Sequence, residues 1–181
     1  MFTMRAGHRV VFIALLLCGC AGERPQRAQP RADRPTATSP RAPSAAVATA
    51  TYVANASSID LFIIGSSELA LQRSSAARVR EFATMMVSAH KGTSAQLSFA
   101  GRRLNLLPSA TLQPRHQAML NELQQSANLD AVYRRHQVAV HDEALHLHST
   151  YAARGTSPTM RPVAKAIVPV IQRHTRLLNY L

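Results

Sequence analysis

Apolar residues recur at spacings of three and four from about Ser57 to the C-terminal end of the chain. This spacing places them along one side of an α-helix. No stretch alternates between apolar and polar residues as a half-buried strand does. The pattern therefore predicts an all-α fold, without strands from which a sheet could be built.

Four long helices account for this pattern. We expect them at about 57–74, 76–101, 129–153 and 158–180. The first is apolar nearly all round, which predicts a largely buried element, and the last has the cleanest apolar stripe. Asn128 is a candidate N-cap, and Ser157-Pro158 is a candidate helix start. Pro169 lies inside the last helix and should bend it, because proline lacks a backbone N–H.

A longer segment, 102–128, separates the second of these helices from the third. It contains Pro108, Pro114 and a short helical stretch around Met119 and Leu120. Such a connection can run back along the bundle, as in the ferritin-like arrangement with one long crossover, or return locally to give an up-down bundle. We expect a four-helix ferritin-like domain over residues 51–181, and the length of the connection leaves both topologies open.

The first twenty residues predict export from the cytosol. Basic residues precede an apolar run from Val10 to Leu17, which is typical of a secretory signal and shorter than the roughly 20 residues that cross a bilayer. The next residues, Cys18-Gly19-Cys20-Ala21, resemble a bacterial lipobox. That resemblance implies removal of residues 1–19 and lipidation of Cys20. The alternative is an ordinary signal peptide cut at Gly19 or Ala21.

The lipobox resemblance also implies a location. Ala21, rather than an aspartate, follows Cys20, which by the sorting rule for such lipoproteins implies the outer membrane, facing the periplasm. The chain has two cysteines, and Cys18 would be removed with the signal. The mature protein would then have no free thiol, so we expect neither a disulfide framework nor a catalytic cysteine.

A segment rich in proline and arginine follows. Residues 20–50 contain five prolines and five arginines among mostly small and polar residues, without apolar periodicity. Such a segment cannot bury enough surface to offset its ordering entropy. We therefore expect a disordered linker between the lipid anchor and the helical domain.

Positive charge limits the classes of partner. The chain has 21 Lys and Arg against 9 Asp and Glu, a net charge of +12. Without aromatic stacking residues beside the arginines, and with a signal for export, we expect no nucleic-acid partner. The expected partners are the membrane, through the N-terminal lipid, and envelope polyanions or envelope proteins. A bias toward arginine without a function would give the same charge.

Three histidines are the residues with the most chemical promise. At 100° per residue, His90 and His174 fall at the centres of the apolar faces of their helices, and His141 falls at the edge of its own. His148 lies two turns beyond His141. His90, His141 and His174 could meet in one polar layer of the bundle. Buried histidines are usually structural and donate to a carbonyl or another side chain, but two or three neutral imidazoles can also hold a metal ion.

Carboxylates decide between kinds of metal site. Di-iron bundles use inward carboxylates and a Glu-x-x-His pair on each of two helices, whereas this chain has that spacing once, at Glu143 and His146. Glu68, Glu81 and Glu143 fall on peripheral positions, so a di-metal oxidase is disfavoured and no catalytic residue is assigned. We favour a non-catalytic interaction or envelope-maintenance role under stress, without a cofactor. The alternative is a bundle that binds zinc, copper or iron through His90, His141 and His174.

Several segments resemble the bacterial envelope family known as domain of unknown function 4142. They are Glu68-Leu69-Ala70-Leu71-Gln72, Val79-Arg80-Glu81-Phe82-Ala83, Met86-Val87-Ser88-Ala89-His90, Leu129-Asp130-Ala131-Val132-Tyr133 with His141, and Val168-Pro169-Val170-Ile171-Gln172-Arg173-His174. The resemblance covers about residues 52–181 and implies a ferritin-like envelope bundle, without a settled activity.

This chain departs from that family's pattern at several positions. Ala89 stands where an acid is typical, Leu129 where Phe is, and Val168 where Leu is. Members also often have acidic residues early in the first helix, where this chain has Ile63-Ile64-Gly65. The loss of those carboxylates argues against a ferritin-like metal site.

Overall fold

The computed structural model describes residues 47–181, whose regular elements are all helices. These are α1 (Thr49–Arg73), α2 (Ala77–Arg102), α3 (Pro114–Gln125), α4 (Leu129–Arg154) and α5 (Arg161–Leu178). The all-α prediction is confirmed. The described residues form five helices rather than four, because part of the connection folds into α3. The signal segment 1–19, Cys20 and the linker up to residue 46 lie outside the described residues.

Helix α1 begins at Thr49, well before the expected start near Ser57. Tyr52 and Val53 are both buried in this first part of the helix. The ring of Tyr52 stacks on the ring of Tyr151, with 3.9 Å between their centroids. These residues belong to a second core cluster at one end of the bundle. Contacts with distant parts of the chain therefore extend the helix beyond its periodic part.

Two other helix starts test the sequence predictions. The side chain of Asn128 accepts a hydrogen bond from the backbone N–H of Ala131 at 3.4 Å, which confirms the predicted cap of α4. Helix α5 begins at Arg161 rather than at Pro158. The reason is that residues 158–160 form a separate turn before the helix.

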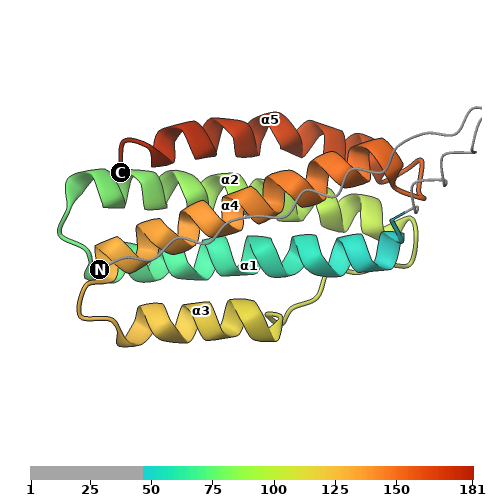
Figure 1. Cartoon of the computed structure of the whole chain (residues 1–181). Coiled ribbons are helices and arrows are strands. Elements are labelled where there is room, and N and C mark those ends of the chain that lie inside the picture. Colours follow the sequence, from blue (N-terminus) through green and yellow to red (C-terminus); the bar gives the residue numbers. More distant parts are fainter. Residues whose placement is uncertain (1–46) are drawn as a thin grey trace, which may run out of the picture. The chain divides into compact units, whose positions relative to one another are not determined.

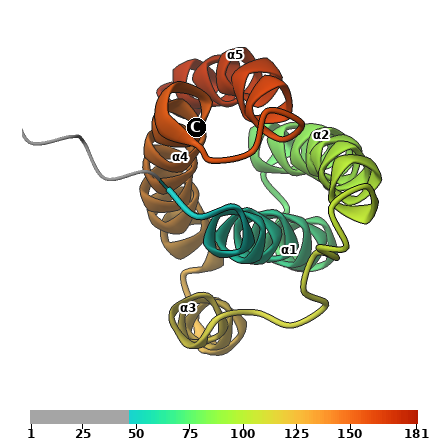
Figure 2. The same cartoon turned by 90° about the vertical axis from the view of Figure 1, so that its right-hand side faces the viewer.

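The four long helices surround one core in the order α1, α2, α5 and α4, and α3 lies outside them beside α1 and α4 (Figure 2). Short links make α1 and α2 antiparallel, and likewise α4 and α5. Hydrogen bonds join Tyr52 to His148 and Ser67 to Tyr133. Because the residue numbers rise along α1 as they fall along α4, these two helices are antiparallel as well.

Helices α2 and α4 consequently run in the same direction (Figure 1). The connection 103–128 must cross the length of the bundle, and α3 makes that return on the outside. Of the two topologies that the sequence left open, the crossover is the one observed. It is held by Ser58 of α1, whose hydroxyl lies 2.7 Å from Nδ1 of His116 and accepts from the backbone N–H of Gln113.

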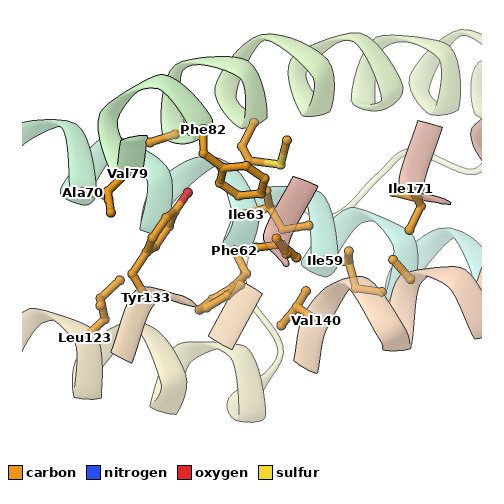
Figure 3. Close-up of a cluster of buried hydrophobic side chains, with 14 of the residues drawn as sticks. Ile59, Phe62, Ile63, Ala70, Val79, Phe82, Leu123, Tyr133, Val140 and Ile171 are labelled. Carbon is orange, nitrogen blue, oxygen red and sulfur yellow. The ribbon is translucent and has the colours of Figure 1, made fainter. Parts of the chain in front are cut away.

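Aromatic and aliphatic side chains from all five helices fill the main core. Figure 3 shows Phe82 of α2 and Tyr133 of α4 pointing toward each other, and their ring centroids are 6.3 Å apart. The hydroxyl of Tyr133 lies 2.8 Å from that of Ser67. Most of the apolar residues that the periodicity placed inward are buried: Val79, Phe82, Ala83, Met86, Leu97, Leu129, Tyr133, Val140, Ala144, Tyr151, Met160, Ala164, Ile167, Ile171 and Leu178. Four others are only partly buried: Val87, Leu147, Val163 and Leu181. Within residues 47–181, no helix is both long and apolar enough to span a membrane.

Candidate metal centre

Three histidines from three helices meet in the core. His90 comes from α2, His141 from α4 and His174 from α5, and none is more than 3% exposed. Their ring centroids are 5.4 to 5.6 Å apart. One ligand nitrogen from each ring lies within 4.8 Å of the other two. The shared layer that helix geometry allowed is therefore present, and we call these residues the histidine triad.

Each ring of the triad has one buried nitrogen without a hydrogen-bond partner among the described residues. These atoms are Nε2 of His90, Nε2 of His141 and Nδ1 of His174. Nδ1 of His141 lies 2.8 Å from the carbonyl oxygen of Gln137. A carbonyl oxygen only accepts, so this Nδ1 carries the proton and Nε2 has a free lone pair. Unpaired buried polar atoms cost free energy, and three of them at one point call for a ligand.

Asp60 of α1 orients the first histidine of the triad. Its carboxylate is 4% exposed, and Oδ1 accepts from Nδ1 of His90 at 2.8 Å. The hydroxyls of Thr93 and Ser94 each donate to the same carboxylate at 2.9 Å. The ring of His90 is thus held with Nε2 free. A histidine that donates one nitrogen to a carboxylate and offers the other to a metal is the usual arrangement at such sites.

The expectation that no carboxylate points into the bundle is wrong, because Asp60 does. The three acids considered from the sequence lie where they were expected. Glu68 pairs with Lys91 at the surface, Glu143 pairs with Arg115 on the outside of the bundle, and Glu81 is exposed. The sequence did contain a signal for Asp60: this acid stands between Ile59 and Leu61, within the most apolar part of its helix, where a buried charge needs a partner.

Burial keeps two members of the triad, His141 and His174, neutral at physiological pH. It lowers the pKa of His141 to about 3, and the nearby His90 adds to the effect. It also lowers the pKa of His174 to about 4, again with His90 and also with Arg173 contributing. Neutral imidazole is the form that binds metal ions. The two rings are therefore in a metal-binding state without first losing a proton.

Comparison with known proteins gives a family and a structural neighbour. The family described as a domain of unknown function, DUF4142, matches residues 34–181. This chain belongs to the DUF4142 family. A search of curated proteins gives no match. Among solved structures, CopM in the Cu(II)-bound form is similar, with a TM-score of 0.63 and 14% identity over 75% of this chain and 96% of that chain. At that identity, the similarity concerns the fold alone.

Among residues 47–181 of this DUF4142 chain, the remaining histidines lie away from the triad or are paired. Nδ1 of His148, one of the residues that helix geometry placed near His141, lies within hydrogen-bond distance of the hydroxyl of Tyr52, at 2.9 Å. Burial raises the pKa of Tyr52 above its ordinary value, so the phenol keeps its proton. His146 is exposed. The structure therefore places His90, His141 and His174 together and leaves His148 in a separate polar pair.

We predict that the metal-free protein loses stability as the pH falls from about 6.5 to about 4. Burial lowers the pKa of His148 to about 4 from the ordinary 6.5, so the unfolded chain binds a proton in this range before the folded chain does. The free energy of unfolding therefore decreases as the pH is lowered, and the decrease is complete below the pKa that His148 has in the folded protein. Urea unfolding at pH 7, 5.5 and 4 measures this. A His148→Gln control should show a shallower decline, and an equal decline in both proteins would contradict the assignment.

Proposed function

We propose that this domain binds one transition-metal ion through the histidine triad, His90, His141 and His174. The observation that carries the proposal is the meeting of three buried histidines, each of which has one ring nitrogen without a hydrogen-bond partner. Three protein ligands leave room for water or an exchangeable ligand. Imidazole suits zinc, copper and iron, and the general order of affinity favours Cu(II). The similar fold of CopM, which was solved with Cu(II), supports copper as the first ion to test.

A purely structural role for these histidines accounts for some of their ring nitrogens and leaves others without a partner. Core histidines are expected to donate to a carbonyl or a side chain, and His90 and His141 do so through Nδ1. Their Nε2 atoms and Nδ1 of His174 are left without partners. A metal ion would satisfy all three nitrogens together, which is why we now favour the metal-binding alternative over a bundle without a cofactor.

A single ion fits the surroundings better than a di-metal centre. Di-metal bundles bridge two ions with several inward carboxylates. The metal-ligating group found among the described residues consists of three histidines without a carboxylate, and the carboxylate of Asp60 is occupied by His90, Thr93 and Ser94. We therefore propose storage or transfer of one ion rather than oxidase chemistry.

The proposal places this metal-binding domain in the bacterial envelope. We propose that the four long helices form a ferritin-like bundle, with α3 as an addition in the crossover. The lipid on Cys20 would hold it at the periplasmic face of the outer membrane, where metal binding would serve envelope maintenance under stress. Fatty-acid labelling of the chain in bacteria, lost in Cys20→Ser, supports the anchor. Labelling of neither protein would contradict it.

A metal titration tests the function. The chain without residues 1–20 is stripped of metal and melted with Cu(II), Zn(II) or Fe(II). An ion that binds the folded state stabilises it by about 2.7 kcal/mol at a hundredfold excess over Kd. We expect a raised melting temperature with copper or zinc. Unchanged melting with all three ions would contradict the proposal.

We predict that Asp60→Asn weakens metal binding roughly 10- to 100-fold, the usual effect of losing a partner behind a ligating histidine. The amide cannot accept with the charge of a carboxylate, so His90 becomes a poorer and less oriented ligand. Competition with a chelator of known affinity measures the change. Glu68→Gln, at an exposed carboxylate of the same helix, is the matched control. Equal affinities of the two variants for the metal would show that Asp60 does not contribute to metal binding.

A further inference from the structure

A shallow groove lies on the outside of the bundle between α2 and α5. Its volume is about 440 Å³, and it is lined by Met85, Ala89, Pro169, Val170, Arg173 and His174. His174 is the residue that this groove shares with the triad. The other two members of the triad, His90 and His141, do not line it.

The two roles of His174 connect the groove with the interior. His174 lines the groove, and its Nδ1 is buried and unpaired in the triad. His90 and His141 are fixed by groups that do not line the groove, Asp60 of α1 and the backbone of α4. An ion that approaches through this groove therefore meets His174 before it meets the other two ligands.

The side chains that line the groove favour some metal ions over others. Met85 offers a neutral, polarisable thioether and is half-buried, so it is reachable from solvent. No carboxylate lines this groove, and its one charged lining residue is Arg173. Hard cations prefer oxygen ligands, whereas thioether and imidazole together suit Cu(I). The mouth of the groove is thus suited to a soft monovalent ion.

We propose that this groove is the route by which metal enters and leaves the triad, and that Met85 is a transient ligand that speeds the passage of Cu(I) relative to Zn(II). The inference rests on the proposed metal-binding function and adds a path and a cargo to it. Only metal–ligand bonds form and break in this passage, no covalent bond within the protein changes, and the ion keeps its oxidation state throughout.

A residue on the route has a kinetic signature. A barrier between solvent and site slows entry and exit equally, because both pass through the same transition state. The rates of loading and release then fall while Kd stays the same. A residue that only supports the fold of the site would instead change Kd. Rates and affinity measured together therefore distinguish a route from a structural role.

Ala89→Leu tests the route by filling the groove. Leucine is a good helix former, and Ala89 is only half-buried. We expect loading and release of Zn(II) and Cu(I) to slow roughly tenfold, which corresponds to a small change in barrier, with Kd unchanged. Ala152→Leu is the matched control. Ala152 lines a different groove, of about 400 Å³, that contains no member of the triad.

Met85→Leu tests the thioether with nearly the same volume, and such substitutions are well tolerated. Stopped-flow loading is measured without oxygen, with Cu(I) supplied as its acetonitrile complex and with Zn(II) as the comparison ion. We expect Cu(I) loading to slow roughly tenfold while Zn(II) loading stays at the wild-type rate. Met119→Leu, at a partly buried methionine of α3, should load both ions at wild-type rates.

Several results would overturn the inference. Wild-type loading rates in both Ala89→Leu and Met85→Leu would show that the ion takes another path. Equal slowing of Zn(II) and Cu(I) in Met85→Leu would show that the thioether is not a ligand on the route. If Ala152→Leu slows loading as much as Ala89→Leu does, the groove is not the route. If the wild-type chain binds none of Cu(I), Cu(II), Zn(II) and Fe(II) at equilibrium, the proposed function itself fails, and that result is separate from any change in rate.

Discussion

Replacing His141 by alanine is expected to abolish binding of copper or zinc to the folded domain. The variant loses one of three ligands, and the ligand it loses is the ring that the backbone of Gln137 holds at 2.8 Å with Nε2 free. Metal should then no longer raise the melting temperature, so the stabilisation of about 2.7 kcal/mol expected at a hundredfold excess over Kd is lost. Melting curves with and without metal measure this.

His146→Ala is the matched control for that experiment. His146 lies on the same helix, is exposed, and belongs to no group that could hold an ion among the described residues. The control should keep the full metal-dependent shift. A variant without His141 that still melts at the wild-type temperature in the presence of metal would show that the ion binds elsewhere.

Replacing Phe62 by alanine is expected to lower the free energy of unfolding by about 3 to 5 kcal/mol, as for other buried aromatic residues. Phe62 is 0% exposed and lies among the labelled core side chains (Figure 3). Its ring packs against His116 of α3 at 5.8 Å and His136 of α4 at 6.1 Å, measured between centroids. The substitution removes contacts that join three helices.

Urea unfolding of the metal-free protein measures the loss, and Phe99→Ala is the control. Phe99 is an aromatic residue of α2 that is 69% exposed, so its replacement should change stability by no more than about 0.5 kcal/mol. Similar losses at Phe62 and Phe99 would contradict the packing of the core described above.

Apolar periodicity predicted the long helices because their buried faces recur along the sequence. Val79, Phe82 and Met86 are buried on one side of α2, as their spacing indicates. The early start of α1 could not be predicted in this way, because Tyr52 is buried by a ring stack with Tyr151, far along the chain. The path of the connection depends in the same manner on the contact of Ser58 with His116.

The candidate site was predictable in its residues and not in its chemistry. His90, His141 and His174 each stand on the inner side of a helix, which spacing alone reveals. The sequence does not show that Asp60 of another helix pairs with His90, or that one nitrogen of each ring is left unpaired in the core. Asp60 was missed because its role depends on His90, thirty residues away on another helix.

X-ray absorption of the protein loaded with one equivalent of zinc tests the central claim most directly. Binding by the histidine triad predicts a first shell of nitrogen at about 2.0 to 2.1 Å, with the outer-shell scattering of three imidazole rings. The same spectrum should appear in His146→Ala, and the signal of three imidazole rings should be absent in His174→Ala. A first shell dominated by oxygen, or a spectrum unchanged by His174→Ala, would contradict metal binding by the triad.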